Sequence, residues 1–183
     1  AVGFTFSLIT RLTDNTIVLG NTSMIVIATG SMAEKNPRNE YIVTENLNNQ
    51  FDAYDIIEIK KYNSQDEVKL YDVVAFKNKN NVTIVHRIIE ILDDGTYITR
   101  GDSNSSSDNG SQYLTSLSYD KIVGKYTGNH IKLLGIFIIF LQSNSGIITV
   151  VSVLYCILMF DRYRVKYFKT VDGILYDKDL TTL

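Results

Sequence analysis

Cysteine is almost absent from this chain of 183 residues, whose one cysteine, Cys156, lies in an apolar run. A single cysteine excludes a disulfide framework and a metal site built from cysteines. A surplus of positive charge is also missing, because 18 Lys and Arg stand against 20 Asp and Glu, with no large basic block in the middle of the chain. We therefore expect no nucleic-acid partner. The length allows one domain with a sizeable core, or such a domain and a membrane anchor.

The chain is organised around an apolar, β-branched stretch between Met24 and Met32. Its composition predicts a strand, which ends at the pair Gly30-Ser31. Glycine permits a sharp turn there, so Ser31 would be held firmly and could face a cleft. A serine hydroxyl is a weak nucleophile unless a base removes its proton. If Ser31 is catalytic, the rest of the sequence must supply that base.

The best candidate for the base is His86, in the strongly strand-like segment 81–91. Alternation along a strand places His86 on one face with Ile84 and Ile88, and Arg87 on the other face. An imidazole on a half-buried face is suited to general base catalysis. The alternative is a histidine that simply packs between strands, and periodicity alone favours that alternative.

Much of the chain up to residue 126 has the pattern of β-strands joined by polar turns. Turns are predicted at 77–80 and 93–95, so the strands beside them pair as an antiparallel meander. Residues 33–50 are polar, and we interpret them as an exposed loop with a short strand at 41–44. The predicted fold class is therefore mainly β, with strands at 55–60, 72–77, 81–91, 96–100 and 121–126.

Residues 101–112 are rich in Ser, Asn and Asp. By composition they form a flexible surface loop. The loop is not a calcium site of the EF-hand type, because the ligand spacing and the closing Glu are absent. The functional interpretation is that Asp102 or Asp108 orients the histidine, as the acid does in a Ser-His-Asp arrangement. Composition alone does not choose between the two aspartates.

Two apolar runs, 133–141 and 146–160, follow near the C-terminus. The second is short for a transmembrane helix, which takes about 20 residues, but the polar residues before it could extend it. Its flank at 161–169 is basic, and the positive-inside rule places such a flank in the cytoplasm. We predict a transmembrane helix over 143–161 and a cytoplasmic tail over 162–183. The alternative is a buried core helix of a soluble protein.

Residues 1–10 are mostly apolar and stop at Arg11. They are too few to cross a bilayer. Because the chain does not begin with Met, we interpret them as the end of an N-terminal membrane segment; a signal-peptide remnant and a packed terminal segment are the alternatives. Residues 11–142 then form the β-rich, catalytic domain.

Three short boxes resemble those of type I signal peptidases, in this order along the chain: Gly30-Ser31-Met32, Val85-His86-Arg87 and Gly101-Asp102-Ser103-Asn104. They are most similar to the endoplasmic-reticulum and archaeal branch, which also occurs in some Gram-positive bacteria. That branch has a histidine where most bacterial enzymes have a lysine. The segments 72–76 and 122–125 add to a likeness that covers roughly residues 20–141.

The resemblance implies coiled antiparallel β-sheets on the outer surface of the cell membrane, with a C-terminal apolar helix behind them. It implies a serine endopeptidase that removes signal peptides from exported proteins after small residues, without a metal or another cofactor. Ser31 would be the nucleophile and His86 the general base. Asp108 matches the acid that partners the histidine, and Asp102 matches the acidic residue of the third box, with a structural or supportive role. The implied partners are signal peptides of preproteins and membrane lipid, and a need for accessory subunits is left open.

The sequence departs from the family pattern beside the first box. Ala33-Glu34 follows Met32 where the family usually has Glu-Pro, and the polar segment from there to Phe51 is longer than expected. These differences affect the cleft edge, and hence substrate preference. There are two alternative functions. One is a membrane-anchored, non-catalytic β-domain that binds an exported protein, in which Ser31 and His86 would not be in contact. The other is a soluble self-cleaving repressor-type peptidase. The latter needs a DNA-binding region and a lysine base, and neither is evident.

Overall fold

The computed structural model describes residues 16–109, 116–171 and 174–177. The interpretation of residues 1–10 as a membrane segment lies outside these ranges. The chain divides into two compact units near residue 139, and each is described by itself.

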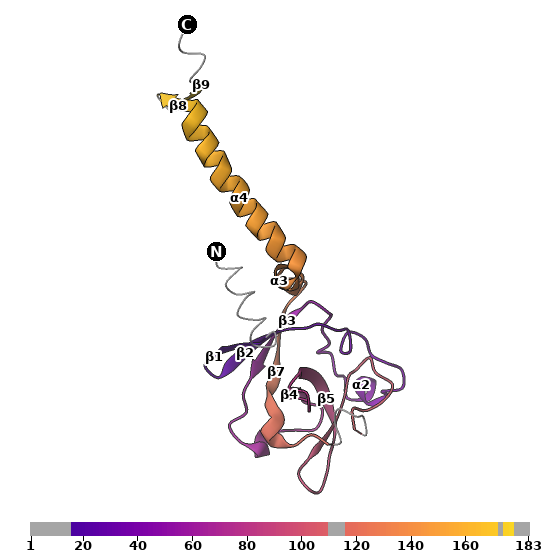
Figure 1. The fold of residues 1–183 in the computed structure, drawn as a ribbon. Coiled ribbons are helices and arrows are strands. Elements are labelled where there is room, and N and C mark those ends of the chain that lie inside the picture. The colour runs from indigo at the N-terminus through magenta and orange to yellow at the C-terminus, as the bar shows by residue number, and fades with distance from the viewer. Residues whose placement is uncertain (1–15, 110–115, 172–173, 178–183) are drawn as a thin grey trace. The chain divides into compact units, whose positions relative to one another are not determined.

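The first unit is built on a seven-stranded sheet in the order β1-β2-β3-β7-β4-β5-β6, and every neighbouring pair of strands is antiparallel (Figure 1). This confirms the predicted mainly β class. Two 3-10 turns, Gln65–Glu67 and Tyr119–Lys121, lie between strands. The strands are β1 Thr16–Leu19, β2 Thr22–Val26, β3 Ile56–Lys60, β4 Val73–Lys77, β5 Thr83–Ile91, β6 Tyr97–Arg100 and β7 Ile122–Ile131.

Strand β4 lies in the middle of the core and is buried on both faces. Because side chains alternate along a strand, Val73 and Ala75 join one apolar cluster, while Val74 and Phe76 join another. Register shifts interrupt the pairing of β3 with β7, of β4 with β7 and of β5 with β6. Such bulges bend the strands, which lets the sheet enclose apolar side chains on both of its faces.

Residues 33–50 form a mainly exposed loop, as predicted, but the strand expected within it at 41–44 is wrong. Residues Tyr41–Thr44 form a short helix, α2, and Ile42 within it is fully buried. The backbone N–H of Ile42 bonds to the carbonyl of Asn39, and the ring of Tyr41 stacks on Tyr71 at 5.4 Å. This local turn, the stacking on Tyr71 and the burial of Ile42 together override the β-propensity of the Ile-Val-Thr run, because β-propensity reflects packing more than the backbone itself.

The C-terminal apolar segment forms α3, Gly135–Gln142, and α4, Asn144–Tyr167. Ser143 separates the two helices, and its hydroxyl caps α4 by accepting the N–H of Gly146. Helix α4 has 24 residues and the length and composition of a membrane span, which confirms the predicted C-terminal apolar helix.

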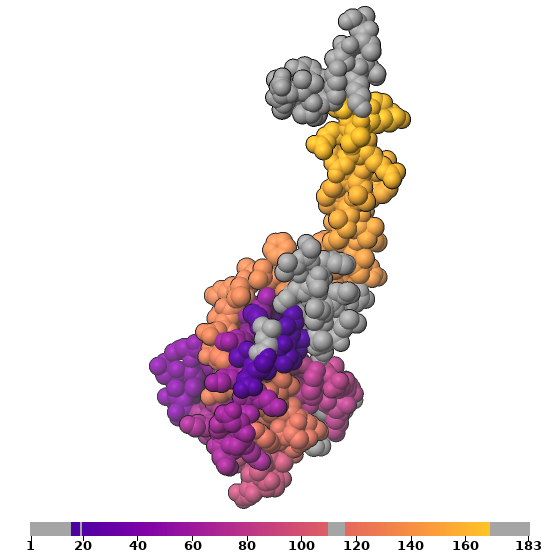
Figure 2. Space-filling view, turned by 90° about the vertical axis from the view of Figure 1, so that its left-hand side faces the viewer, coloured from indigo at the N-terminus to yellow at the C-terminus, as the bar shows by residue number. Residues whose placement is uncertain are grey.

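A core helix would bury its side chains, but those of α4 lie at the surface (Figure 2). The helix continues past residue 161 through Arg164 and Lys166, and cations in the last turn favour the negative end of the helix dipole. A hairpin of β8, Phe168–Val171, and β9, Ile174–Asp177, follows.

Candidate active site

Ser31 lies in a turn just after β2, and both ends of that turn are fixed. The backbone of Ile27 exchanges hydrogen bonds with Tyr54 and Asp55, which holds the chain beyond the end of the strand. The N–H of Ala33 bonds to the carbonyl of Gly30 and closes the turn. Met32 is fully buried in the core, so it anchors the backbone immediately after Ser31.

His86 lies in β5 opposite Val74 of β4, and both of its ring nitrogens have partners. Nδ1 lies 2.6 Å from Oδ2 of Asp108, and Nε2 lies 2.9 Å from Oγ of Ser31. A carboxylate only accepts hydrogen bonds, so Nδ1 carries the proton and, in the neutral ring, Nε2 can accept the hydroxyl of Ser31. His86 therefore does more than pack between strands. The contact also contradicts the non-catalytic alternative, which required Ser31 and His86 to be apart.

Asp108 approaches His86 from the loop after β6. Its backbone N–H bonds to the carbonyl of Thr99, and its Oδ2 accepts the Thr99 hydroxyl at 2.7 Å. Sequence reasoning missed Thr99, although a signal existed. Thr99 pairs with Ile88 across the β5–β6 hairpin, so it lies on the face of the sheet that carries His86.

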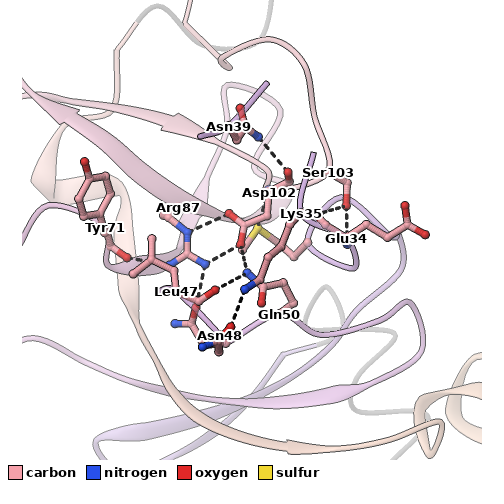
Figure 3. A network of polar contacts seen from close by, with 12 residues as sticks. Glu34, Lys35, Asn39, Leu47, Asn48, Gln50, Tyr71, Arg87, Asp102 and Ser103 are labelled. Atoms are coloured by element: carbon pink, nitrogen blue, oxygen red, sulfur yellow. Dashed lines mark hydrogen bonds and ion pairs between the residues drawn. The ribbon is translucent and has the colours of Figure 1, made fainter. Parts of the chain in front are cut away.

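Asp102 does not contact His86, since its carboxylate faces Arg87 on the opposite side of β5 (Figure 3). Nε of Arg87 donates to Oδ1 at 2.8 Å and Nη2 donates to Oδ2 at 2.5 Å, which makes a bidentate ion pair. Gln50 also donates to Oδ2. The buried guanidinium of Arg87 therefore takes up the carboxylate of Asp102, and this side chain does not itself fold the loop onto the site. The loop is shaped instead by the backbone of Asp102, whose carbonyl accepts the N–H of Asn36.

Gly101 permits the close approach of this loop to the reacting groups. A Cβ at this position would lie 2.6 Å from the carbonyl oxygen of Ser31 and 3.0 Å from Nε2 of His86. The next residues hold the Ser31 turn, because the N–H of Ser103 donates to the Ser31 carbonyl at 2.9 Å. Any residue larger than glycine would therefore clash with the backbone of Ser31 and the ring of His86.

A cleft of about 390 Å³ opens beside Ser31 and His86. Its walls come from residues 25–29 and 82–85, and Phe51 and Asn104 complete the lining. The walls are mainly apolar, so they suit an extended chain with apolar side chains. Within the described ranges, no three His, Cys, Asp or Glu side chains are grouped as metal ligands. The site thus brings a hydroxyl, an imidazole and a carboxylate into contact beside a cleft, an arrangement that can support nucleophilic catalysis.

Comparison with known proteins gives one relationship. No family model matches the chain. Over 90 residues it is 24% identical to signal peptidase I W of Bacillus subtilis (strain 168), and the match covers 48% of this chain and 45% of that protein. The chain therefore spans about half the length of the relative it matches. The similarity indicates a distant relationship to signal peptidase I and points to a peptidase-type hydrolase. Together with helix α4, it also indicates association with a membrane.

Proposed function

We propose that this chain is a membrane-bound serine endopeptidase that removes signal peptides from exported proteins, of the endoplasmic-reticulum and archaeal type. The observation that carries the proposal is the row of contacts from Ser31 through His86 to Asp108, at 2.9 and 2.6 Å. These distances lie within the range over which a base activates a nucleophile. The similarity to a signal peptidase I supports the choice of substrate.

The proposed reaction uses the site as an acyl-transfer centre. Nε2 of His86 takes the hydroxyl proton as Oγ of Ser31 attacks the scissile carbonyl carbon, and the imidazolium is stabilised by Asp108. The same proton passes to the leaving amine when the peptide bond breaks. Water then attacks the acyl-serine with His86 again as base, which releases the carboxylate and restores Ser31. Backbone N–H groups beside Ser31, with the hydroxyl of Thr29 in the cleft wall, are the candidate oxyanion donors.

The cleft is proposed to hold the signal peptide as an extended strand between residues 25–29 and 82–85. Ile27, Phe51 and Ile84 supply bulky walls near Ser31, which favours small side chains before the cut, in the Ala-x-Ala manner of signal peptides. The basic residues at the end of α4 favour a cytoplasmic C-terminus. The β-rich unit would then work on the extracytoplasmic side of the cell membrane.

The proposal is tested with the full chain in detergent and a preprotein substrate. Ser31→Ala should lose preprotein cleavage, whereas Ser105→Ala, an exposed serine of the third-box loop, should keep it. A serine-reactive fluorophosphonate should label the parent and Ser105→Ala but not Ser31→Ala. Cleavage that persists in Ser31→Ala, or a parent protein that binds the preprotein without cutting it, would contradict the proposal.

The proposed topology has its own test, because Cys156 is the only cysteine of the chain. In a Cys156→Ser background, a cysteine replacing the exposed Lys166 should be shielded from an impermeant thiol reagent in intact cells. A cysteine replacing the exposed Lys79 in the β4–β5 turn should react. Labelling at 166 with protection at 79 would reverse the orientation.

A further inference from the structure

The polar segment 33–50, which departs from the family pattern, is tied closely to the third-box loop. Four of its amide side chains contact that loop or Arg87, and they are Asn36, Asn39, Asn49 and Gln50. Figure 3 shows this side of the network, with Asn39 directed at the backbone of Asp102. Three of the five Asn residues of the segment, Asn36, Asn39 and Asn49, thus make side-chain contacts with residues 38 to 67 positions away.

Asn39 is the most deeply buried of these amides, with 1% of its surface exposed. Its Nδ2 donates to the carbonyls of Asp102 and Asn104, at 2.9 and 3.0 Å. Its Oδ1 accepts Nη1 of Arg100 at 2.7 Å. Both hydrogens of the amide are used, and a buried polar group that lost these partners would carry its full desolvation cost. Asn39 therefore fixes the positions of residues 102 and 104, on either side of Ser103.

Ser103 connects these fixed residues to the turn that carries Ser31. Its N–H donates to the carbonyl of Ser31 at 2.9 Å, and its Oγ accepts the N–H of Glu34 at 2.9 Å. The same hydroxyl lies 3.0 Å from the carbonyl of Gly30, to which it donates. Residues on both sides of the Ser31 turn are thus held by one residue, whose two neighbours are held by Asn39.

We propose that Asn39 is a positioning residue for Ser31, and that residues 33–50 are a strap that presses residues 102–104 against the nucleophile turn. The inference rests on the proposed peptidase function, since it concerns the alignment of Ser31 with His86. Oγ of Ser31 and Nε2 of His86 are 2.9 Å apart, and this distance can change little without loss of activity. A displacement of about 1 Å can lower the rate by a factor on the order of 100.

The decisive variant is Asn39→Asp, which keeps the size of the side chain and the contact with Arg100 but removes both donated hydrogen bonds. Its matched control is Asn48→Asp, in the same segment, where the amide bonds only to Asn46 and Lys35. For a soluble peptide substrate, Asn39→Asp should lower kcat by about 10- to 100-fold and leave KM unchanged. The rate at which a fluorophosphonate labels Ser31 should also be lower in Asn39→Asp. That rate is divided by the folded fraction of the protein, which a thermal melt gives. Asn48→Asp should match the parent in all three.

A second variant decides the question if Asn39→Asp does not fold. Ser103→Ala removes the hydroxyl contacts at a partly exposed site, and it should show the same fall in kcat, which Ser103→Thr should largely restore. The positioning role would be overturned if folded Asn39→Asp had the kcat and the labelling rate of the parent. If Asn39→Asp does not fold, the same result in Ser103→Ala would overturn it. The failure of the proposed function is separate, because it appears before any strap variant is made: either the parent does not cleave the preprotein, or Ser31→Ala still does.

Discussion

The β5–β6 hairpin carries a polar cluster on each face, and the two clusters differ in their access to solvent. His86 and Thr99 lie on one face, where both hydrogen-bond to Asp108. Arg87 lies on the other face, where it forms an ion pair with Asp102. Both aspartates come from the same loop. The side chains of His86 and Asp108 are 10% and 17% exposed, whereas those of Arg87 and Asp102 are both fully buried.

Under the proposed function, this difference in exposure separates a reacting pair, His86 and Asp108, from a structural pair, Arg87 and Asp102. A buried ion pair is tolerated only when its hydrogen bonds are satisfied, and Arg87 meets this condition through Asp102, Asn49 and the Tyr71 carbonyl. No donor of that guanidinium faces the cleft. His86, in contrast, lines the cleft and offers Nε2 to Ser31. In the proposed reaction, a substrate in the cleft exchanges a proton with the first cluster, while the second cluster holds the loop that carries both aspartates.

The largest effect is expected from removing the base on the cleft side. His86→Ala should lower kcat by a factor on the order of 10⁶, as loss of the general base does in a serine protease, with little change in the melting temperature. His86→Lys should not restore the activity, because a lysine places its nitrogen at the end of a flexible stem and needs desolvation to act as a base. Turnover of a preprotein by purified variants checks both. Cleavage that survives in His86→Ala would remove the distinction between the clusters.

The sequence alone was sufficient for β3 to β6 and for the opposite directions of His86 and Arg87, because alternation along a strand is local. The sequence interpretation missed β1, and β2 ends at Val26, before the predicted end at Gly30-Ser31. It was not sufficient to rank Asp102 and Asp108, since their partners depend on how a loop folds over a hairpin. Family position favoured Asp108 for His86, and the structure places Asp108 there. Asn39 and the helix at Tyr41–Thr44 escaped prediction for a related reason. Their conformation is set by residues some 60 positions away or by burial, which no local pattern records.

The second expected effect separates the two aspartates by their chemistry. Asp108→Asn should keep the fold but lower kcat by about 10⁴-fold, because an amide favours the wrong imidazole tautomer and leaves the cation without a counter-charge. The melting temperature should stay close to that of the parent, since Asp108 is partly exposed. Parallel kinetics and thermal melts measure the two quantities. Near-parent turnover would show that Asp108 does not act through His86.

The third effect is expected in stability. Asp102→Asn leaves the buried Arg87 charge without its counter-charge, which should cost about 3–5 kcal/mol of unfolding free energy. The double variant Arg87→Met with Asp102→Leu should recover much of that loss, because an apolar pair of similar volume avoids burying a charge. Chemical denaturation of the three proteins gives the comparison. If Asp102→Asn is fully stable but inactive, the assignments of the two aspartates must be exchanged.

The smallest effect is expected at Thr99, which belongs to the cleft-side cluster without touching the nucleophile. Its hydroxyl donates to the same Asp108 oxygen that accepts the N–H of His86 Nδ1, so it helps to hold that oxygen against the ring. Thr99→Val keeps the shape of the side chain and removes one hydrogen bond to a charged group, which is worth about 1.5–3 kcal/mol. If this hydrogen bond acts wholly through Asp108, its loss corresponds to a fall in kcat on the order of 10- to 100-fold.

Thr99→Ser is the matched control, since it keeps the hydroxyl and loses only a methyl group. The two variants should differ in kcat more than in melting temperature. In an Asp108→Asn background, Thr99→Val should have almost no further effect, because the oxygen it orients no longer carries the charge. Full additivity of the two substitutions would instead mean that Thr99 supports the hairpin, as the opposite face does, and has no part in orienting His86.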